Sequence, residues 1–121
     1  MSVFLNIPKE NYLLEGEYFF VIRDKYPVSP GHALIVSKEE KLEYFELSTE
    51  EKAELTTMID QTKTEIENVY SPDGYNIGMN SGSVAGQTVM HFHCHVIPRY
   101  KGDMEDPRGG VRHCITGKGY Y

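Results

Sequence analysis

The chain has few cysteines, no long apolar run and no excess of basic residues. Its two cysteines, Cys94 and Cys114, do not form the pattern of a secreted disulfide framework or of a Cys-x-x-Cys zinc knuckle. No segment approaches the roughly 20 consecutive apolar residues of a transmembrane helix. The first residues also lack the basic start and apolar stretch of a secretory signal. These absences predict a cytoplasmic protein without a membrane partner.

The balance of charge argues against nucleic acid as a partner. The net charge is −6, from 18 acidic and 12 basic residues, and the clustered Lys and Arg that recruit phosphate backbones are missing. A small phosphate ligand stays compatible with this charge, because backbone amides in one local pocket can bind it. The length of 121 residues, without repeats or low-complexity segments, predicts one domain over residues 1–121.

The order of the apolar patterns predicts an α+β fold. Strands are expected at residues 18–23, 32–37, 75–79 and 89–98, where β-branched and aromatic residues are frequent, with a hairpin tip at 15–17. Strands, then one helix, then strands are typical of a mostly antiparallel sheet covered by a helix. We therefore expect about five antiparallel strands with one long helix packed on them.

The long helix is expected at residues 48–70. Ser48 and Glu51 fit a capping box at its start. Its apolar stripe is predicted from residues at intervals of three and four: Leu55, Ile59, Thr62, Ile66 and Val69.

Three of the five histidines fall within five residues, as His91, His93 and His95. Alternate residues of a strand share a face, so the three imidazoles are expected on one side and Phe92 and Cys94 on the other, against the helix. This row could be a solvated strand face, a zinc site or a nucleophilic histidine at a phosphate site. His-x-His suits zinc, but the outer two side chains of a straight strand lie about 13 to 14 Å apart.

The residues before the row favour the phosphate site. Gly86, Gln87 and Thr88 stand at the junction between a loop and the strand. Glycine lets the backbone approach a ligand, and consecutive amides can form an anion-binding nest. Gln87 adds an amide and Thr88 a hydroxyl group. Neutral imidazole is a competent nucleophile near pH 7, which indicates covalent catalysis.

These residues closely resemble the histidine triad family, whose mark is His-φ-His-φ-His-φ-φ with φ apolar. The segment His91-Phe-His-Cys-His-Val-Ile97 matches this mark, and the resemblance covers roughly residues 18–99. It implies a HIT-like fold and a metal-independent nucleotide hydrolase or nucleotidyltransferase. It also implies a reaction without a cofactor, a small-molecule nucleotide substrate and a homodimer.

The resemblance also implies roles for single residues. His93 would be the nucleophile that forms a nucleotidyl-histidine intermediate, and His91 and His32 would orient the row. The remaining implied residues all bind the nucleotide: His95, Thr88 and Gln87 at the α-phosphate, Asn80 at the ribose or a phosphate, Asp24 at the ribose, and Gly86 in the loop beside them.

The same resemblance narrows the expected reaction. Sugar-phosphate uridylyltransferases of the superfamily carry Gln where this chain has His95, which favours hydrolysis over transfer. Pro98 and Arg99 are similar to the dinucleoside polyphosphate hydrolase branch. The predicted substrates are diadenosine polyphosphates or related adenosine 5'-phosphate derivatives, cleaved at the α-phosphate. The alternatives are a nucleoside phosphoramidase and a nucleotide-binding regulatory protein with little turnover.

The basic residues of the tail allow two interpretations. Arg99, Arg108 and Arg112 could hold the distal phosphates of a long substrate or simply lie on the surface, and His113 is expected on the surface.

Overall fold

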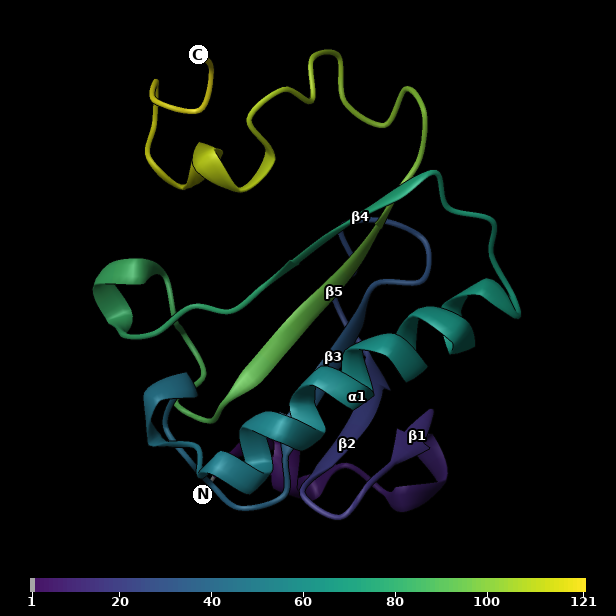
Figure 1. The fold of residues 1–121 in the computed structure, drawn as a ribbon, viewed down its shortest axis with the longest axis vertical. Helices are drawn as coiled ribbons and strands as arrows, with labels where there is room; N and C mark the ends of the chain where they lie inside the picture. Colours follow the sequence, from purple (N-terminus) through teal and green to yellow (C-terminus); the bar gives the residue numbers. More distant parts are fainter. Residues whose placement is uncertain (1) are drawn as a thin grey trace.

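A computed structural model describes residues 2–121 as one sheet with a helix across it (Figure 1). Its strands are β1 (Leu14–Glu15), β2 (Phe19–Arg23), β3 (Ala33–Ser37), β4 (Gly74–Gly78) and β5 (His93–Arg99). All neighbours are antiparallel, in the order β1-β2-β3-β5-β4. The predicted α+β fold, with five antiparallel strands and one long helix, is confirmed.

Helix α1 (Thr49–Glu67) begins with the predicted capping box. The Ser48 hydroxyl accepts from the Glu51 amide at 3.1 Å, and the Glu51 carboxylate accepts from the Ser48 amide at 2.7 Å. Ile66 is the last buried residue of the helix, whereas Val69 lies beyond its end and is 68% exposed. The predicted stripe was therefore wrong at Val69, because the chain leaves the sheet after Ile66. Within residues 2–121, no helix combines the length and the apolar character needed to cross a bilayer.

Both faces of the sheet are covered, but by different parts of the chain. On one face, α1 packs on alternate residues of β2, β3 and β5, including Phe19, Ile35 and Cys94. On the other face the N-terminal segment supplies Phe4, which closes a second cluster with Phe20, Ile22, Leu34 and Val36. Short 3-10 helices at Val3–Asn6 and Lys9–Asn11 carry this segment across the sheet.

The strand expected at 89–98 begins only at His93. β3 ends at Ser37, and the Phe92 amide donates instead to the Lys41 carbonyl at 2.7 Å, because the chain after β3 has turned away. The alternation of faces nevertheless continues upstream of the ladder. Phe92, Cys94 and Val96 all lie in the cluster beneath α1, as expected. The other predicted strands are each found within one residue of their expected bounds.

Candidate functional site

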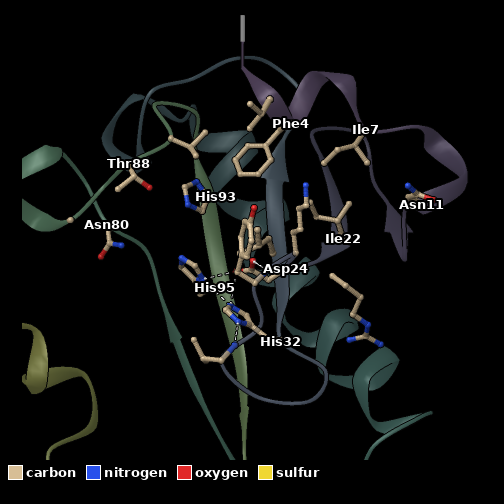
Figure 2. Close-up of a pocket in the computed structure, with 18 residues that line it drawn as sticks. Phe4, Ile7, Asn11, Ile22, Asp24, His32, Asn80, Thr88, His93 and His95 are labelled. Atoms are coloured by element: carbon tan, nitrogen blue, oxygen red, sulfur yellow. Dashed lines mark hydrogen bonds and ion pairs between the residues drawn. The ribbon is translucent and has the colours of Figure 1, made fainter.

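A cavity of about 980 Å³ lies on the face of the sheet away from α1 (Figure 2). Strand register determines what lines it. His93 pairs with Val36, and His95 pairs with Leu34. One strand further, Phe20 pairs with Val36 and Ile22 with Leu34. Because paired residues share a face, two imidazoles stand at the edge of an apolar floor made by β2 and β3.

The cavity is divided into an apolar half and a polar half. The apolar half is lined by Phe4, Ile7, Ile22, Leu34 and Val89. The polar half is lined by Asp24, His32, Asn80, Thr88, His93 and His95. Apolar walls with a few convergent polar groups are typical of small-molecule sites, and this volume lies at the upper end of their range.

Beyond His95, the cavity opens toward β4. Gly78 is the β4 residue that pairs with His95, and a Cβ atom built on it would meet nothing within 4 Å. Asn80 and Thr88 line the cavity on this side of the histidines, whereas Ile7 and Ile22 lie on the opposite side (Figure 2). The two imidazoles therefore stand between the apolar residues of the cavity and its open side toward β4; the lining also includes Asn11, Arg23 and Lys25.

The hydrogen bonds of His93 fix the position of its proton. Its Nδ1 lies 2.8 Å from the His91 carbonyl oxygen. A carbonyl oxygen can only accept, so Nδ1 carries the proton and the lone pair is left on Nε2. The Phe4 ring packs edge-on against the imidazole, with centroids 5.1 Å apart. In the neutral tautomer that this bond selects, His93 therefore offers a free lone pair on Nε2.

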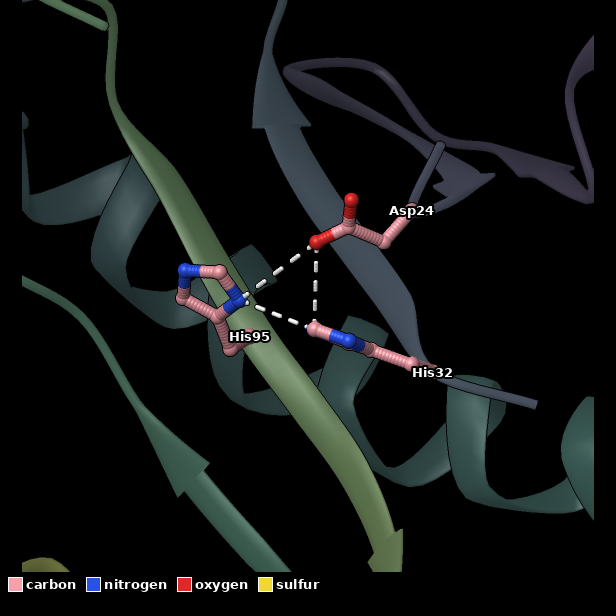
Figure 3. Close-up of side chains that lie close together, drawn as sticks. All are labelled: Asp24, His32 and His95. Atoms are coloured by element: carbon pink, nitrogen blue, oxygen red, sulfur yellow. Dashed lines mark hydrogen bonds and ion pairs between the residues drawn. The ribbon is translucent and has the colours of Figure 1, made fainter. Parts of the chain in front are cut away.

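A chain of three groups fixes the proton of His95 in the opposite sense (Figure 3). The Val28 amide donates to His32 Nδ1 at 3.1 Å, so the proton of neutral His32 is on Nε2. That nitrogen lies 2.9 Å from His95 Nδ1, which must accept. The proton of neutral His95 is then on Nε2. His93 therefore offers a lone pair and His95 a donor, two residues apart on β5.

Burial keeps these imidazoles uncharged. Desolvation, with smaller contributions from His32 and His93, lowers the pKa of His95 to about 4. Desolvation also lowers the pKa of His32, against the opposing charge of Asp24. The pKa of His91 is lowered for the same main reason. The tautomers assigned to His32 and His95 therefore describe these two residues at neutral pH.

The backbone before His32 is held by residues on the helix side of the sheet, among them Tyr70, which follows α1. Gly31, which precedes His32, has φ +90°, and a Cβ there would meet the Tyr70 ring at 2.9 Å. Arg23 donates to the Gly31 carbonyl at 2.7 Å and lies over the Tyr70 ring, 5.4 Å from its centroid. These contacts fix the backbone where the loop after β2 returns to the sheet.

Asp24 lies at the boundary between the two halves of the cavity. Its Oδ1 accepts from the Tyr26 amide at 2.9 Å. Its Oδ2 lies 3.3 Å from His32 Nε2 and 3.9 Å from His95 Nδ1. Asp24, His32 and His95 are also close enough together, by their donor atoms, to hold a metal ion.

His91 is buried and does not line the cavity. Its Nε2 donates to the Ser37 carbonyl at 2.7 Å, while its Nδ1 has no hydrogen-bond partner among residues 2–121. The Phe4 ring lies edge-on against it, with centroids 5.5 Å apart. The His91 carbonyl oxygen holds His93 in place, and the His91 ring supports Phe4 from behind the cavity wall.

The expected phosphate nest before the triad is not formed. The amides of Gly86 and Gln87 donate to the Ser83 and Gly82 carbonyls of their own loop. The Gln87 side chain is buried as well: it accepts from the Gly82 amide and donates to the carbonyls of Leu42 and Val89. Gln87 therefore holds the loop together, and Gly86 and Thr88 line the cavity beside it.

The basic residues of the tail are engaged away from the cavity. Arg99 pairs with Asp103 at 2.7 Å and donates to Asn76 at 2.6 Å. Arg108 pairs with Asp106, and His113 bonds to the Arg108 carbonyl. Within residues 2–121, the cavity is lined by none of these basic residues.

The sequence interpretation missed the apolar compartment. Phe4 and Ile7 come from a segment without a regular pattern, so nothing local indicated their place. A signal was nevertheless present in β2 and β3, whose consecutive apolar residues are buried on both faces although α1 covers only one. A second cover was therefore required.

Comparison with known proteins agrees with this architecture. The model of the HIT domain family matches residues 6–102. The chain is 36% identical over 89 residues to the AP-4-A phosphorylase of Mycobacterium tuberculosis, covering 73% of this chain and 46% of that protein. It is 38% identical over 80 residues to the asymmetrical bis(5'-nucleosyl)-tetraphosphatase of Schizosaccharomyces pombe, covering 66% and 44%. The chain thus spans less than half the length of these two relatives.

A solved structure extends the likeness to three dimensions. The hypothetical histidine triad nucleotide-binding protein of Sulfolobus tokodaii superimposes with a TM-score of 0.72 at 36% identity, covering 76% of this chain and 62% of that one. The family match covers well over half of the chain, and it includes the triad, of which His93 and His95 line the cavity. The chain belongs to the histidine triad (HIT) family.

Proposed function

We propose that this protein is a nucleotide hydrolase that cleaves dinucleoside polyphosphates at the α-phosphorus through a nucleotidyl-His93 intermediate. The observation that carries this proposal is the pair of opposite tautomers on β5: a free lone pair at His93 Nε2 and a donor at His95 Nε2. The names of the two relatives, which act on Ap4A and on bis(5'-nucleosyl) tetraphosphates, support this substrate class.

The two halves of the cavity orient the nucleotide. The base lies on the apolar floor of Ile22 and Leu34, beneath Phe4, where burial of its rings is favourable. Asp24, at the boundary between the halves, accepts hydrogen bonds from the ribose hydroxyls. The α-phosphate then falls beside His93 and His95. The leaving phosphates extend over Gly78 toward Asn80 and Thr88, where the cavity is open.

The first step forms a covalent intermediate. The lone pair of His93 Nε2 attacks the α-phosphorus, a P–N bond forms, and the bond from phosphorus to the bridging oxygen breaks. The nucleoside polyphosphate leaves with that electron pair. The His91 carbonyl stabilises the positive charge on the His93 ring through Nδ1–H, while His95 Nε2–H donates to the oxyanion that develops on phosphorus.

The second step restores the enzyme. Water attacks the same phosphorus and loses a proton to solvent, the P–N bond breaks, and nucleoside monophosphate is released while the electron pair of that bond returns to His93 Nε2. Inorganic phosphate in place of water would give nucleoside diphosphate instead. The phosphorylase among the relatives makes this second acceptor worth testing.

The test is product analysis of diadenosine tetraphosphate, with and without inorganic phosphate, in chelator. The proposal expects AMP and ATP from the wild type, and at least about a 1000-fold lower rate from His93→Ala. His113→Gln, outside the cavity, should behave like the wild type and controls for loss of an arbitrary imidazole.

Three results would contradict the proposal. Full turnover by His93→Ala rejects the covalent step. Absence of turnover by the wild type, together with AMP binding, indicates a nucleotide-binding protein instead. ADP formed only when phosphate is present would make the protein a phosphorylase rather than a hydrolase.

A further inference from the structure

Asp24, His32 and His95 bring three metal-ligating atoms together on one side of the cavity (Figure 3). The separations are 2.9 Å from His32 Nε2 to His95 Nδ1, 3.3 Å from His32 Nε2 to Asp24 Oδ2 and 3.9 Å from His95 Nδ1 to Asp24 Oδ2. The point equidistant from these three atoms lies about 2.0 Å from each, which is the length of a Zn–N or Zn–O bond in proteins.

We propose that these three residues form a binding site for a divalent transition-metal ion, with Zn²⁺ as the preferred ion. Two imidazoles and one carboxylate are ligands that suit zinc, whereas Mg²⁺ and Ca²⁺ prefer oxygen ligands alone. The equidistant point lies in the plane of the three atoms, whereas the ligand atoms of a tetrahedral ion lie about 3.3 Å apart, so binding requires the 3.9 Å separation between His95 Nδ1 and Asp24 Oδ2 to shorten. All three residues line the cavity, which leaves the fourth position of the ion open to it. The ion takes no part in the hydrolysis proposed above.

The site exists in two exclusive states. Without a metal, His32 carries its proton on Nε2, because the Val28 amide donates to Nδ1. A metal at Nε2 needs that lone pair, so the proton of His32 moves to Nδ1 and the Val28 amide loses its acceptor. Val28 is 71% exposed, which lets this amide turn to water. The Val28 amide therefore reports whether a metal occupies this site and no other.

The metal and a nucleotide should exclude one another. A carboxylate that binds the ion does not accept from ribose hydroxyls, and the ion occupies the boundary at which the ribose would lie. This consequence rests on the proposed function, but the metal site itself does not. Zn²⁺ bound at this site would therefore inhibit the proposed nucleotide hydrolysis.

The first experiment measures Zn²⁺ binding by calorimetry, on protein without a histidine tag. One ion per chain is expected for the wild type and for His113→Gln, the matched histidine control. Asp24→Asn and His32→Asn should bind at least about 10-fold more weakly, since each lacks a ligand. Unchanged binding in both variants, or no binding to the wild type up to about 0.1 mM Zn²⁺, overturns the proposal. Thermal melting shows that the variants are folded.

The second experiment needs no variant. In amide NMR spectra of the wild type, Zn²⁺ should shift the Val28 resonance and speed its hydrogen exchange, whereas Mg²⁺ should do neither. Zinc binding that leaves Val28 unmoved overturns the proposal. An AMP titration then follows: AMP should weaken Zn²⁺ binding at least about 10-fold at saturation. A wild type that binds Zn²⁺ but neither binds nor cleaves nucleotides rejects the proposed function and leaves the metal site standing.

Discussion

The two faces of the sheet are made from alternate residues of the same strands, yet they differ in almost every property. The face beneath α1 is closed: Phe19, Ile35 and Cys94 are fully buried against the helix. The opposite face is only partly covered, by the N-terminal segment and Phe4, and it holds the cavity and its imidazoles. One face supplies most of the packed core, and the other holds the cavity. Adjacent residues such as Cys94 and His95 therefore lie in different environments, one in the core and one in the cavity wall.

Phe92→Ala should show the largest difference in stability between changes on the two faces. Phe92 is 2% exposed beneath α1, so its loss leaves a cavity in the closed face and should lower the free energy of unfolding by about 3–5 kcal/mol. Urea denaturation measures this loss. Phe4→Ala is the matched control: on the open face it should cost less stability but reduce nucleotide affinity, because Phe4 walls the apolar compartment. A larger stability loss from Phe4→Ala would reverse the assignment of the faces.

His95→Ala should affect chemistry and leave stability nearly unchanged. Loss of one donor to a developing oxyanion lowers kcat by about 100-fold to 1000-fold. His95 lines the cavity and is not part of the hydrophobic core, so the Tm of the variant should stay close to that of the wild type. Steady-state kinetics on diadenosine tetraphosphate, beside a thermal melt, tests both halves of this expectation. A normal kcat would show that His95 contributes no donor.

Acid should weaken the fold through the open face. Burial lowers the pKa of His95 to about 4, below its ordinary value of 6.5, so the unfolded chain takes up the proton first as pH falls. The resulting stability is complete above pH 6.5 and is lost as pH falls toward 4, by about 3 kcal/mol. Urea denaturation at several pH values measures the slope. His95→Gln should flatten it, and an equal slope in both proteins would place the acid sensitivity elsewhere.

Ser48→Ala should have the smallest effect and touch only the closed face. The hydroxyl caps the first turn of α1, and its loss costs about 1 kcal/mol of stability. Activity per folded molecule should be that of the wild type. A change in kcat would show that the helix is coupled to the cavity.

The closed face was largely predictable from the sequence, because its signals are local. The capping box spans four residues, and the alternation of Phe92 and Cys94 is fixed by strand geometry. The open face was predictable only where a motif marked it, at His93 and His95. Phe4 is buried by contacts with strands remote in the chain, which no short pattern encodes.

Gln87 shows why the rest of the site was not predictable. Beside Thr88 it looked like a phosphate ligand, but its side chain is turned inward by the Leu42 carbonyl, 45 residues away. Val28 is a similar case: its side chain carries no chemistry, yet its amide sets the tautomer of His32. Residue type indicated the candidates at this site, and only tertiary hydrogen bonds decided which way each one faces.

The contacts that hold the backbone before His32 have a consequence for which residues of the cavity can be changed. Arg23 and Tyr70 hold the backbone at Gly31 from the helix side, independently of the side chains further along the loop. Tyr26 and Val28 are 77% and 71% exposed at the cavity rim. Replacement of either side chain should therefore change the rim of the cavity and leave the backbone that supports His32 in place. The shape of the rim and the position of the histidine are thus set by separate contacts, so one can be altered without the other.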